Sequence, residues 1–183
     1  MPLLQQFCLA AKAAGAKVVS CDNLANAVTY LVQEAGETLL LPVSASCIRH
    51  QLAEQLQAAG VKLPEVKREA AAQATAGVTS ACFGIADTGT LVLDSLAEDV
   101  RLASTLPPRH FILLDKRKIV ADGLAAAPLL RQAHQQNPRN YIAYITGPSR
   151  TADIERVLTI GVHGPKQLDI LLLDDWSSDL LEM

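Results

Sequence analysis

A short run of turn-forming, hydroxyl and guanidinium residues at positions 146–151 is the segment of this sequence best suited to chemistry. It reads Thr-Gly-Pro-Ser-Arg-Thr and follows an apolar, strand-like run. Gly147 and the proline after it favour a sharp turn. Ser149 and Thr151 can cap a helix that begins near Arg150. Because backbone N–H groups at a helix start attract anions, this strand–turn–helix junction is predicted to bind a small carboxylate or another anion.

The same loop has a purely structural alternative. It can be an ordinary helix start, in which Asp153 and Glu155 complement the positive end of the helix dipole. These two acids offset part of the positive field, and so they weaken the case for an anion site. Open α/β sheets bind ligands at the carboxyl ends of their strands, and the loop is expected at such a position.

A second group of functional side chains surrounds a predicted hairpin turn at residues 86–90, Ala-Asp-Thr-Gly-Thr. Gly89 suits the turn because glycine accepts a positive φ. Thr88, Gly89 and Thr90 are predicted to contact ligand oxygen atoms. Asp87 is a candidate catalytic group, as a general base or an orienting carboxylate. The alternative is a type I′ turn flanked by residues that favour strands.

A third candidate segment is Gly-Val-His-Gly-Pro-Lys at residues 161–166. His163 is a candidate catalytic residue because histidine is the side chain that exchanges a proton near neutral pH. Lys166 can bind a carboxylate or a phosphate. The alternative is a tight loop whose histidine is merely exposed to solvent.

Other polar and sulfur-bearing side chains are interpreted as structural. Arg101, Arg109 and His110 are predicted to be surface or capping residues. The four cysteines show no Cys-x-x-Cys spacing, so an iron–sulfur or zinc site within the chain is not expected. They are Cys8, Cys21, Cys47 and Cys82. Walker, dinucleotide-binding and serine-hydrolase motifs are absent, so nothing in the sequence supports a nucleotide-hydrolysing or serine-hydrolase function.

Composition points to a cytoplasmic globular protein. The 183 residues suit a single domain over residues 1–183, and half of them are hydrophobic. The net charge of −3, without a basic stripe, argues against nucleic-acid binding. No apolar run reaches the length of a membrane span, and the first residues lack the pattern of a signal peptide. The sequence does not indicate an oligomeric state.

The elements that must position these groups alternate between helix and strand, which favours parallel βα units. Helices are predicted at residues 3–14, 22–35, 44–60, 68–76, 101–105, 122–135 and 150–159. Strands are predicted at residues 16–21, 38–43, 82–86, 90–94, 110–114, 118–120, 141–145 and 168–173. The two strands that flank the turn at Gly89 form a central β-hairpin. The predicted fold is therefore α/β and Rossmann-like, with a mixed, mostly parallel sheet.

Four segments together resemble a known family. They are residues 84–93, 106–110, 146–155 and 161–165. In this order and spacing they are similar to the LUD-domain family, and within it to the lactate-utilisation protein C branch. The resemblance is strong over residues 77–174, whereas only the βα rhythm supports it in the first part of the chain.

The resemblance implies both a fold and a function. The fold is that of phosphosugar isomerases and CoA transferases (NagB/RpiA/CoA-transferase-like). The function is L-lactate oxidation to pyruvate, as one subunit of an oxidoreductase system whose iron–sulfur clusters lie on partner proteins. The three candidate segments would then bind the substrate, and His163 or Asp87 would move a proton. No cofactor is identified in this chain. A non-catalytic assembly or ligand-sensing subunit is the alternative, and fold analogy alone suggests an isomerase or transferase.

Overall fold

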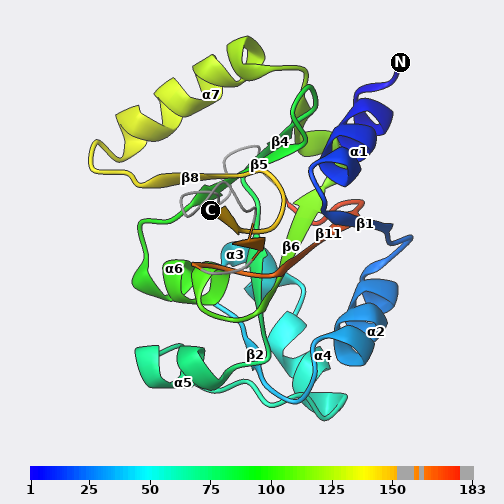
Figure 1. Ribbon diagram of the computed structural model, residues 1–183, viewed down its shortest axis with the longest axis vertical. Helices are drawn as coiled ribbons and strands as arrows, with labels where there is room; N and C mark the ends of the chain where they lie inside the picture. Colours follow the sequence, from blue (N-terminus) through cyan, green and yellow to red (C-terminus); the bar gives the residue numbers. More distant parts are fainter. Residues whose placement is uncertain (152–158, 161–162, 178–183) are drawn as a thin grey trace.

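The computed structural model describes residues 1–151, 159–160 and 163–177, which form a layered α/β fold (Figure 1). Its central layer is a five-stranded parallel sheet with the strand order β1-β11-β6-β3-β2. The strands are β1 (Lys17–Ser20), β2 (Leu39–Leu40), β3 (Ala76–Ser80), β6 (Arg109–Asp115) and β11 (Gln167–Leu173). The predicted α/β class with mostly parallel pairing is confirmed.

The two longest strands are apolar on both faces because both faces of the sheet are covered. All residues of β6 after Arg109, and all residues of β11 after Gln167, are buried. Such a continuous buried run is typical of a parallel strand. One face packs against three helices, with Leu31, Leu56 and Phe111 in the shared core. These helices are α2 (Leu24–Glu34), α3 (Ala45–Arg49) and α4 (Leu52–Ala58).

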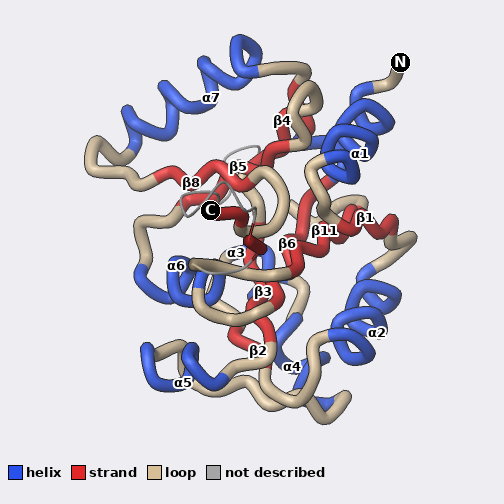
Figure 2. Tube along the Cα trace, in the orientation of Figure 1, coloured by secondary structure: helices blue, strands red, loops and turns tan. Residues whose placement is uncertain are grey.

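The other face is covered by helix α1 (Leu3–Ala13) and by a second, four-stranded sheet (Figure 2). Its strands, in the order β7-β4-β5-β8, are β7 (Ile119–Val120), β4 (Phe83–Ile85), β5 (Thr90–Asp94) and β8 (Ile142–Ile145). β4 and β5 form the predicted hairpin, β8 pairs antiparallel with β5, and β7 pairs parallel with β4. Helix α7 (Gly123–Gln136) packs on the outer face. The mixed pairing thus belongs to a separate sheet.

Helices α5 (Arg68–Gln73) and α6 (Glu98–Thr105) pack together beside β2 and β3. Helix α6 lies unusually close to β3, because a Cβ atom at Gly77 would stand 2.0 Å from the carbonyl oxygen of Ala103. Glycine is therefore required here for close approach and not for a turn. The remaining elements are the 3₁₀ helix Lys116–Lys118, β9 (Arg150–Thr151) and β10 (Thr159–Ile160).

Three sequence-based element predictions are wrong. Strand β3 is missing from the predicted strands because its small and polar residues carry no strand pattern. The helix predicted over residues 44–60 is divided, since Gln51 between α3 and α4 has a φ of 49°. Residues 118–120 are expected from the sequence to continue the strand at 110–114 after a turn, but Ile119–Val120 instead pairs with β4 in the other sheet.

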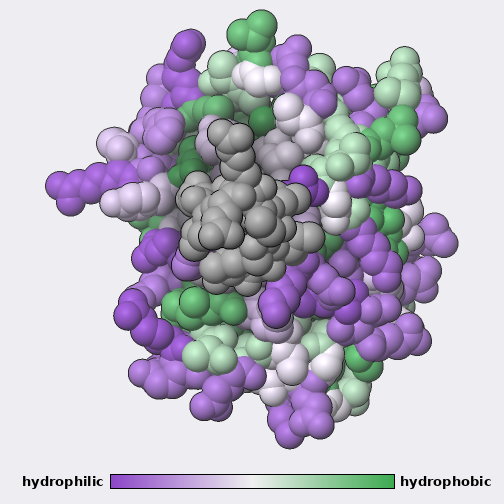
Figure 3. Space-filling view, in the orientation of Figure 1, coloured by the Kyte–Doolittle hydropathy of each residue, from purple (hydrophilic) through white to green (hydrophobic). Residues whose placement is uncertain are grey.

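Side-chain caps mark the start of three helices, at residue types that favour this position. Asn23, Ser44 and Asp122 each accept a hydrogen bond from the backbone N–H three residues further on, at 2.8–3.2 Å. Hydrophilic side chains cover much of the face seen in Figure 3, with smaller apolar areas between them. No helix in the described part of the chain combines the length and the apolar character that a membrane span requires.

Candidate functional site

A cavity of about 530 Å³ lies between α6, β8 and the amino ends of β6 and β11. Its polar lining comprises Ser95, Arg101, Ser104, Thr105, His110, Tyr144, Thr146, Ser149 and His163. Its apolar lining comprises Ala143, Ile145, Pro148, Pro165 and Leu168, together with two glycines. No Asp or Glu occurs among the described residues that line it, so the cavity favours a ligand of negative charge.

Three of the predicted site residues, Gly147, Ser149 and His163, line this cavity. Their two loops are in contact, because the backbone N–H of Ser149 donates to the carbonyl oxygen of Pro165 at 2.9 Å. A Cβ atom at Gly164 would lie 2.9 Å from the Cβ of Ser149, which shows how closely the loops pack. His163 is exposed to solvent. The structure thus brings the first and third candidate segments together.

The threonines of the hairpin are linked to the cavity only indirectly, through the hydroxyl group of Thr146. The Oγ1 atoms of Thr88 and Thr90 are 2.7 Å apart, and those of Thr90 and Thr146 are also 2.7 Å apart. Thr90 is buried, whereas Thr146 lines the cavity. Thr88 and Thr90 themselves do not line it, so they lie behind its wall.

The other two hairpin residues also lie outside the cavity lining. Asp87 is exposed, and its backbone N–H donates to the carbonyl oxygen of Ala121 at 3.0 Å. Gly89 has a φ of 68°, and a Cβ atom there would lie 2.2 Å from the backbone nitrogen of Ala11 in α1. Because Gly89 is the one residue of this loop with a positive φ, the loop is not the type I′ turn considered from the sequence.

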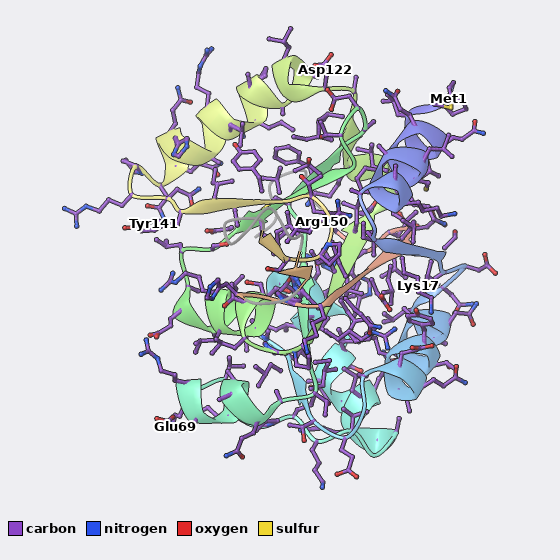
Figure 4. The ribbon with its side chains drawn as sticks, in the orientation of Figure 1. Met1, Lys17, Glu69, Asp122, Tyr141 and Arg150 are labelled. Atoms are coloured by element: carbon purple, nitrogen blue, oxygen red, sulfur yellow. The ribbon has the colours of Figure 1, made fainter. Side chains whose placement is uncertain are left out.

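Arg150 contacts helix α1 and does not line the cavity. Its guanidinium donates to the carbonyl oxygen of Ala14, at the end of that helix (Figure 4). Gly147, with a φ of 78°, approaches the same carbonyl oxygen, which would lie 2.2 Å from an added Cβ atom. A cation at a helix carboxyl end is favourable because it interacts with the free carbonyl groups. The loop therefore holds the end of α1 with one side and lines the cavity with the other.

The helix predicted over residues 150–159 is absent at its first residues and at its last residue, which are the parts of it that the structure describes. Arg150–Thr151 is strand β9, and it pairs antiparallel with β10, so no helix begins at Arg150 or extends to Thr159. The middle of the predicted helix, with Asp153 and Glu155, lies outside the described residues. The preceding strand, β8, belongs to the smaller sheet, so the loop is not at the carboxyl edge of the parallel sheet.

Lys166 lies at a second, polar cavity of about 300 Å³, beside Arg109 and Asp169. The side chain of Arg109 is 16% exposed and forms ion pairs with Asp169 and with Glu34, whose Oε2 is 2.7 Å from Nη1. Hydrogen bonding from Arg109 lowers the pKa of Glu34. Of the surface or capping role predicted for Arg109, the capping part holds, because Nη1 also donates to the carbonyl oxygen of Glu34, the last residue of α2, at 2.9 Å; the same side chain joins α2 to β11.

Arg101 is a cavity residue whose importance is not visible from the sequence. Its Nη1 donates to the carbonyl oxygens of Ser95 and Leu96 at 2.6 and 2.5 Å, which fixes the guanidinium. No ion pair involves it among the described residues. Arg101 is exposed, as a surface role predicts, but its side chain caps no helix end and also lines the cavity. The signal that could have found it is helical spacing, since Ser104 and Thr105 line the same cavity from the next turn of α6.

His110 is also a cavity residue, and its predicted surface position is wrong. It is 1% exposed, and its Nε2 lies 2.9 Å from the Oγ1 of Thr79. Burial lowers the pKa of His110 to about 3, so the imidazole is neutral at physiological pH. It can therefore orient a ligand or a water molecule through hydrogen bonding, but it cannot supply positive charge there.

The donor set suits anion binding and proton transfer. Arg101 supplies the positive charge, hydroxyl groups supply hydrogen bonds, and His163 supplies an imidazole in contact with solvent. The Oγ of Ser95 is buried without a hydrogen-bond partner among the described residues. No group of three His, Cys, Asp or Glu side chains suited to a metal ion is found in the described part of the chain.

Comparison with known proteins places this chain in a family. The family model of the LUD domain matches residues 4–173, so the chain belongs to the LUD-domain family, and the resemblance seen in its motifs is confirmed. A Neisseria meningitidis protein is 42% identical over 98 residues, 54% of this chain and 42% of that protein. Lactate utilization protein C of Bacillus subtilis is 38% identical over 107 residues, 57% of this chain and 45% of that protein. The chain thus spans less than half the length of these relatives.

A solved structure shows the same fold. The crystal structure of a DUF162 family protein from Deinococcus radiodurans matches 93% of this chain and 96% of its own, with a TM-score of 0.63. The two sequences are 20% identical, so this likeness supports the architecture alone.

Proposed function

We propose that this chain is a carboxylate-binding component of an L-lactate utilisation system, in which L-lactate is oxidised to pyruvate together with iron–sulfur partner proteins. The family and the name of the Bacillus subtilis relative support the role in lactate utilisation. The observation that carries the binding role is the cavity, in which Arg101 stands among hydroxyl groups with no carboxylate in the described lining.

Arg101 would bind the carboxylate of the ligand. A guanidinium matches the geometry of a carboxylate and can form two parallel hydrogen bonds with it. Nη1 already donates to two backbone carbonyl oxygens, so the side chain is oriented before the ligand arrives. Ser149 and Thr146, which line the cavity from the loop after β8, would bond the 2-hydroxyl group.

His163 would move the proton. Oxidation of a 2-hydroxy acid to the 2-oxo acid breaks the O–H and C2–H bonds and releases two protons and two electrons. In this proposal the proton from C2 passes to solvent. An imidazole is suited to accept the hydroxyl proton near neutral pH. The two electrons require an acceptor, which in this proposal is an iron–sulfur partner protein.

Binding is tested by calorimetric titration of the purified chain with L-lactate and with pyruvate. Arg101→Gln should raise the dissociation constant at least about tenfold, because the charged hydrogen bonds to the carboxylate are lost. The matched control is Arg68→Gln, which removes an exposed arginine that pairs with Glu98 on the surface. Absence of any binding to the unchanged chain would refute the carboxylate site.

Catalysis is tested by lactate-dependent dye reduction with the iron–sulfur partners present. His163→Ala should reduce turnover over about 100-fold, or about 2.7 kcal/mol of barrier, while complex assembly is retained. His134→Ala, an exposed histidine on α7, serves as the control. Unchanged turnover in His163→Ala would favour an assembly or sensing subunit. Full activity of the isolated chain would contradict the need for partners.

A further inference from the structure

The cavity lining combines charged or polar side chains with apolar ones. Arg101 on α6 and His163 are among the polar residues. Ala143 and Ile145 on β8, and Leu168 at the start of β11, are among the apolar residues and are called the apolar lining below. A ligand that uses both kinds of lining must carry an anionic group and an apolar body.

The size of the cavity exceeds what lactate needs. Cavities of about 300–1,000 Å³ enclose drug-sized molecules, and this one is about 530 Å³. Lactate is a three-carbon acid with a single methyl group. Bound through its carboxylate at Arg101, it would leave most of the cavity, including the part lined by the half-buried Ala143 and Ile145, to water. Covering such apolar surface is the main source of binding free energy for an apolar group.

The apolar lining is built from elements that hold the cavity open. Leu168 is 3% exposed and lies in β11, paired with His110 of β6. Ala143 and Ile145 lie in β8, which pairs with β5 along its length. On the opposite side, α6 is held against β3 by the close contact at Gly77. Because strands and a tightly packed helix form these walls, the cavity cannot easily shrink around a small ligand.

We infer that the ligand is a 2-hydroxy or 2-oxo acid with a larger apolar side chain than lactate, branched or aromatic. Its carboxylate would bind Arg101, and its side chain would pack against Ala143, Ile145 and Leu168. This inference rests on the proposed function, because it uses the same cavity and the same carboxylate site. It differs in substrate class, since lactate would be a short and weakly bound member of the series.

The test is a titration series with the unchanged chain, using L-lactate, L-2-hydroxybutyrate, L-2-hydroxy-4-methylpentanoate and L-3-phenyllactate. The dissociation constant should fall about fourfold for each methylene group buried. A constant that stays flat, or rises with side-chain size, would overturn the inference while leaving lactate binding intact. If none of the four acids binds, the proposed function fails together with it.

Two variants locate the side chain of the ligand. Ala143→Leu fills space beside the apolar lining and should weaken phenyllactate binding by over about tenfold, and weaken it more than lactate binding. Ile145→Thr keeps a β-branched residue in the strand and should weaken the larger acids about fivefold. Leu124→Thr, 85% exposed on α7, is the control. Unchanged affinity for phenyllactate in both variants would show that the side chain binds elsewhere, which contradicts the inference.

Discussion

The two edges of the parallel sheet are closed in different ways. At the carboxyl edge, residues 174–177 cover the ends of the strands. Trp176 is 2% exposed, its indole N–H donates to the Oγ of Ser80 at 3.3 Å, and its ring stacks on His50 with 5.0 Å between centroids. A cavity of only about 120 Å³ lies at this edge. The amino edge has no comparable plug among the described residues and borders the cavity of about 530 Å³.

The difference shows that strand direction alone does not locate a site. Ligands of open α/β sheets usually bind at the carboxyl ends of the strands. Here residues 174–177 occupy that position, and the buried carboxylate of Asp115 helps to hold this segment in place. This carboxylate accepts hydrogen bonds from the backbone N–H of Ser177 at 3.0 Å and from Nη2 of Arg117 at 2.8 Å. The carboxyl edge thus contributes stability, and the amino edge is available for binding.

Among the variants proposed here, truncation of Trp176 at the carboxyl edge should have the largest effect on stability. Trp176→Ala should lower the free energy of unfolding by about 3–5 kcal/mol, because it leaves a large hole in the core. Ligand affinity at the amino edge should not change. The measurement is denaturant unfolding alongside calorimetry, with Tyr141→Ala as an exposed aromatic control. A loss below about 1 kcal/mol would show that the carboxyl edge does not depend on Trp176.

The buried histidine should make the amino edge sensitive to mild acid. The unfolded chain protonates His110 near pH 6.5, and the folded chain only near pH 3, so this contribution to stability is complete above pH 6.5 and declines as the pH falls. The loss should be roughly 3 kcal/mol between pH 6.5 and 4. His110→Gln should flatten this part of the pH profile, measured by unfolding at each pH. An unchanged slope in His110→Gln would mean that His110 titrates normally in the fold.

The carboxyl edge should respond only to stronger acid. Burial alone would raise the pKa of Asp115, but hydrogen bonds from Arg117 and Ser177 outweigh it and lower the pKa. The contribution of a carboxyl group with a lowered pKa is present above its unfolded pKa, near pH 4, and is lost as the pH falls through the folded value. Asp115→Asn should cost about 2 kcal/mol at neutral pH. Asp87→Asn, at an exposed position, should cost almost nothing, and equal losses in the two variants would contradict this assignment.

The smallest expected loss of stability is that of Arg150→Gln, and this variant distinguishes the role of Arg150 from that of Arg101. Arg150→Gln should lower the free energy of unfolding by about 1 kcal/mol, because the last carbonyl group beyond α1 loses a charged donor. The dissociation constant for lactate should change less than about twofold, in contrast to Arg101→Gln. Thermal unfolding and calorimetry on both variants make the comparison. A large loss of affinity in Arg150→Gln would move the carboxylate site from α6 to the loop after β8.

Most of the fold could be predicted because its signals are local. The caps at Asn23 and Asp122, the apolar run of β6 and the hairpin around Gly89 follow from neighbouring residues. The assignment of the strands to two sheets could not be predicted, because it depends on pairing between distant segments. Strand β3 could not be predicted for a related reason. Its Gly77 interrupts the strand pattern, and only the close packing of α6 explains why a glycine is needed there.

The site could be predicted only in part. Ser149 and His163 are recognisable because turn residues surround them, and the structure places both at the cavity. Arg101 and His110 resemble ordinary surface residues in the sequence, and only the packing of α6 and β6 brings them to the same wall. The reverse holds for Arg150, whose guanidinium looks available in the sequence but is engaged by the end of α1.

The position of β1 has a consequence for synthesis in the cell. Among the described strands, β1 pairs only with β11, and residues Lys17–Ser20 lie opposite Asp169–Leu172. A ribosome that adds about 5–20 residues per second needs roughly 8–30 s to go from one strand to the other. Helix α1 can pack within that interval on segments made earlier, because its Phe7 and Ala11 share a core with Leu91 and Ile119. β1 has no strand partner until β11 emerges, and the cavity, whose described lining ends at Leu168, should be completed at the same late stage.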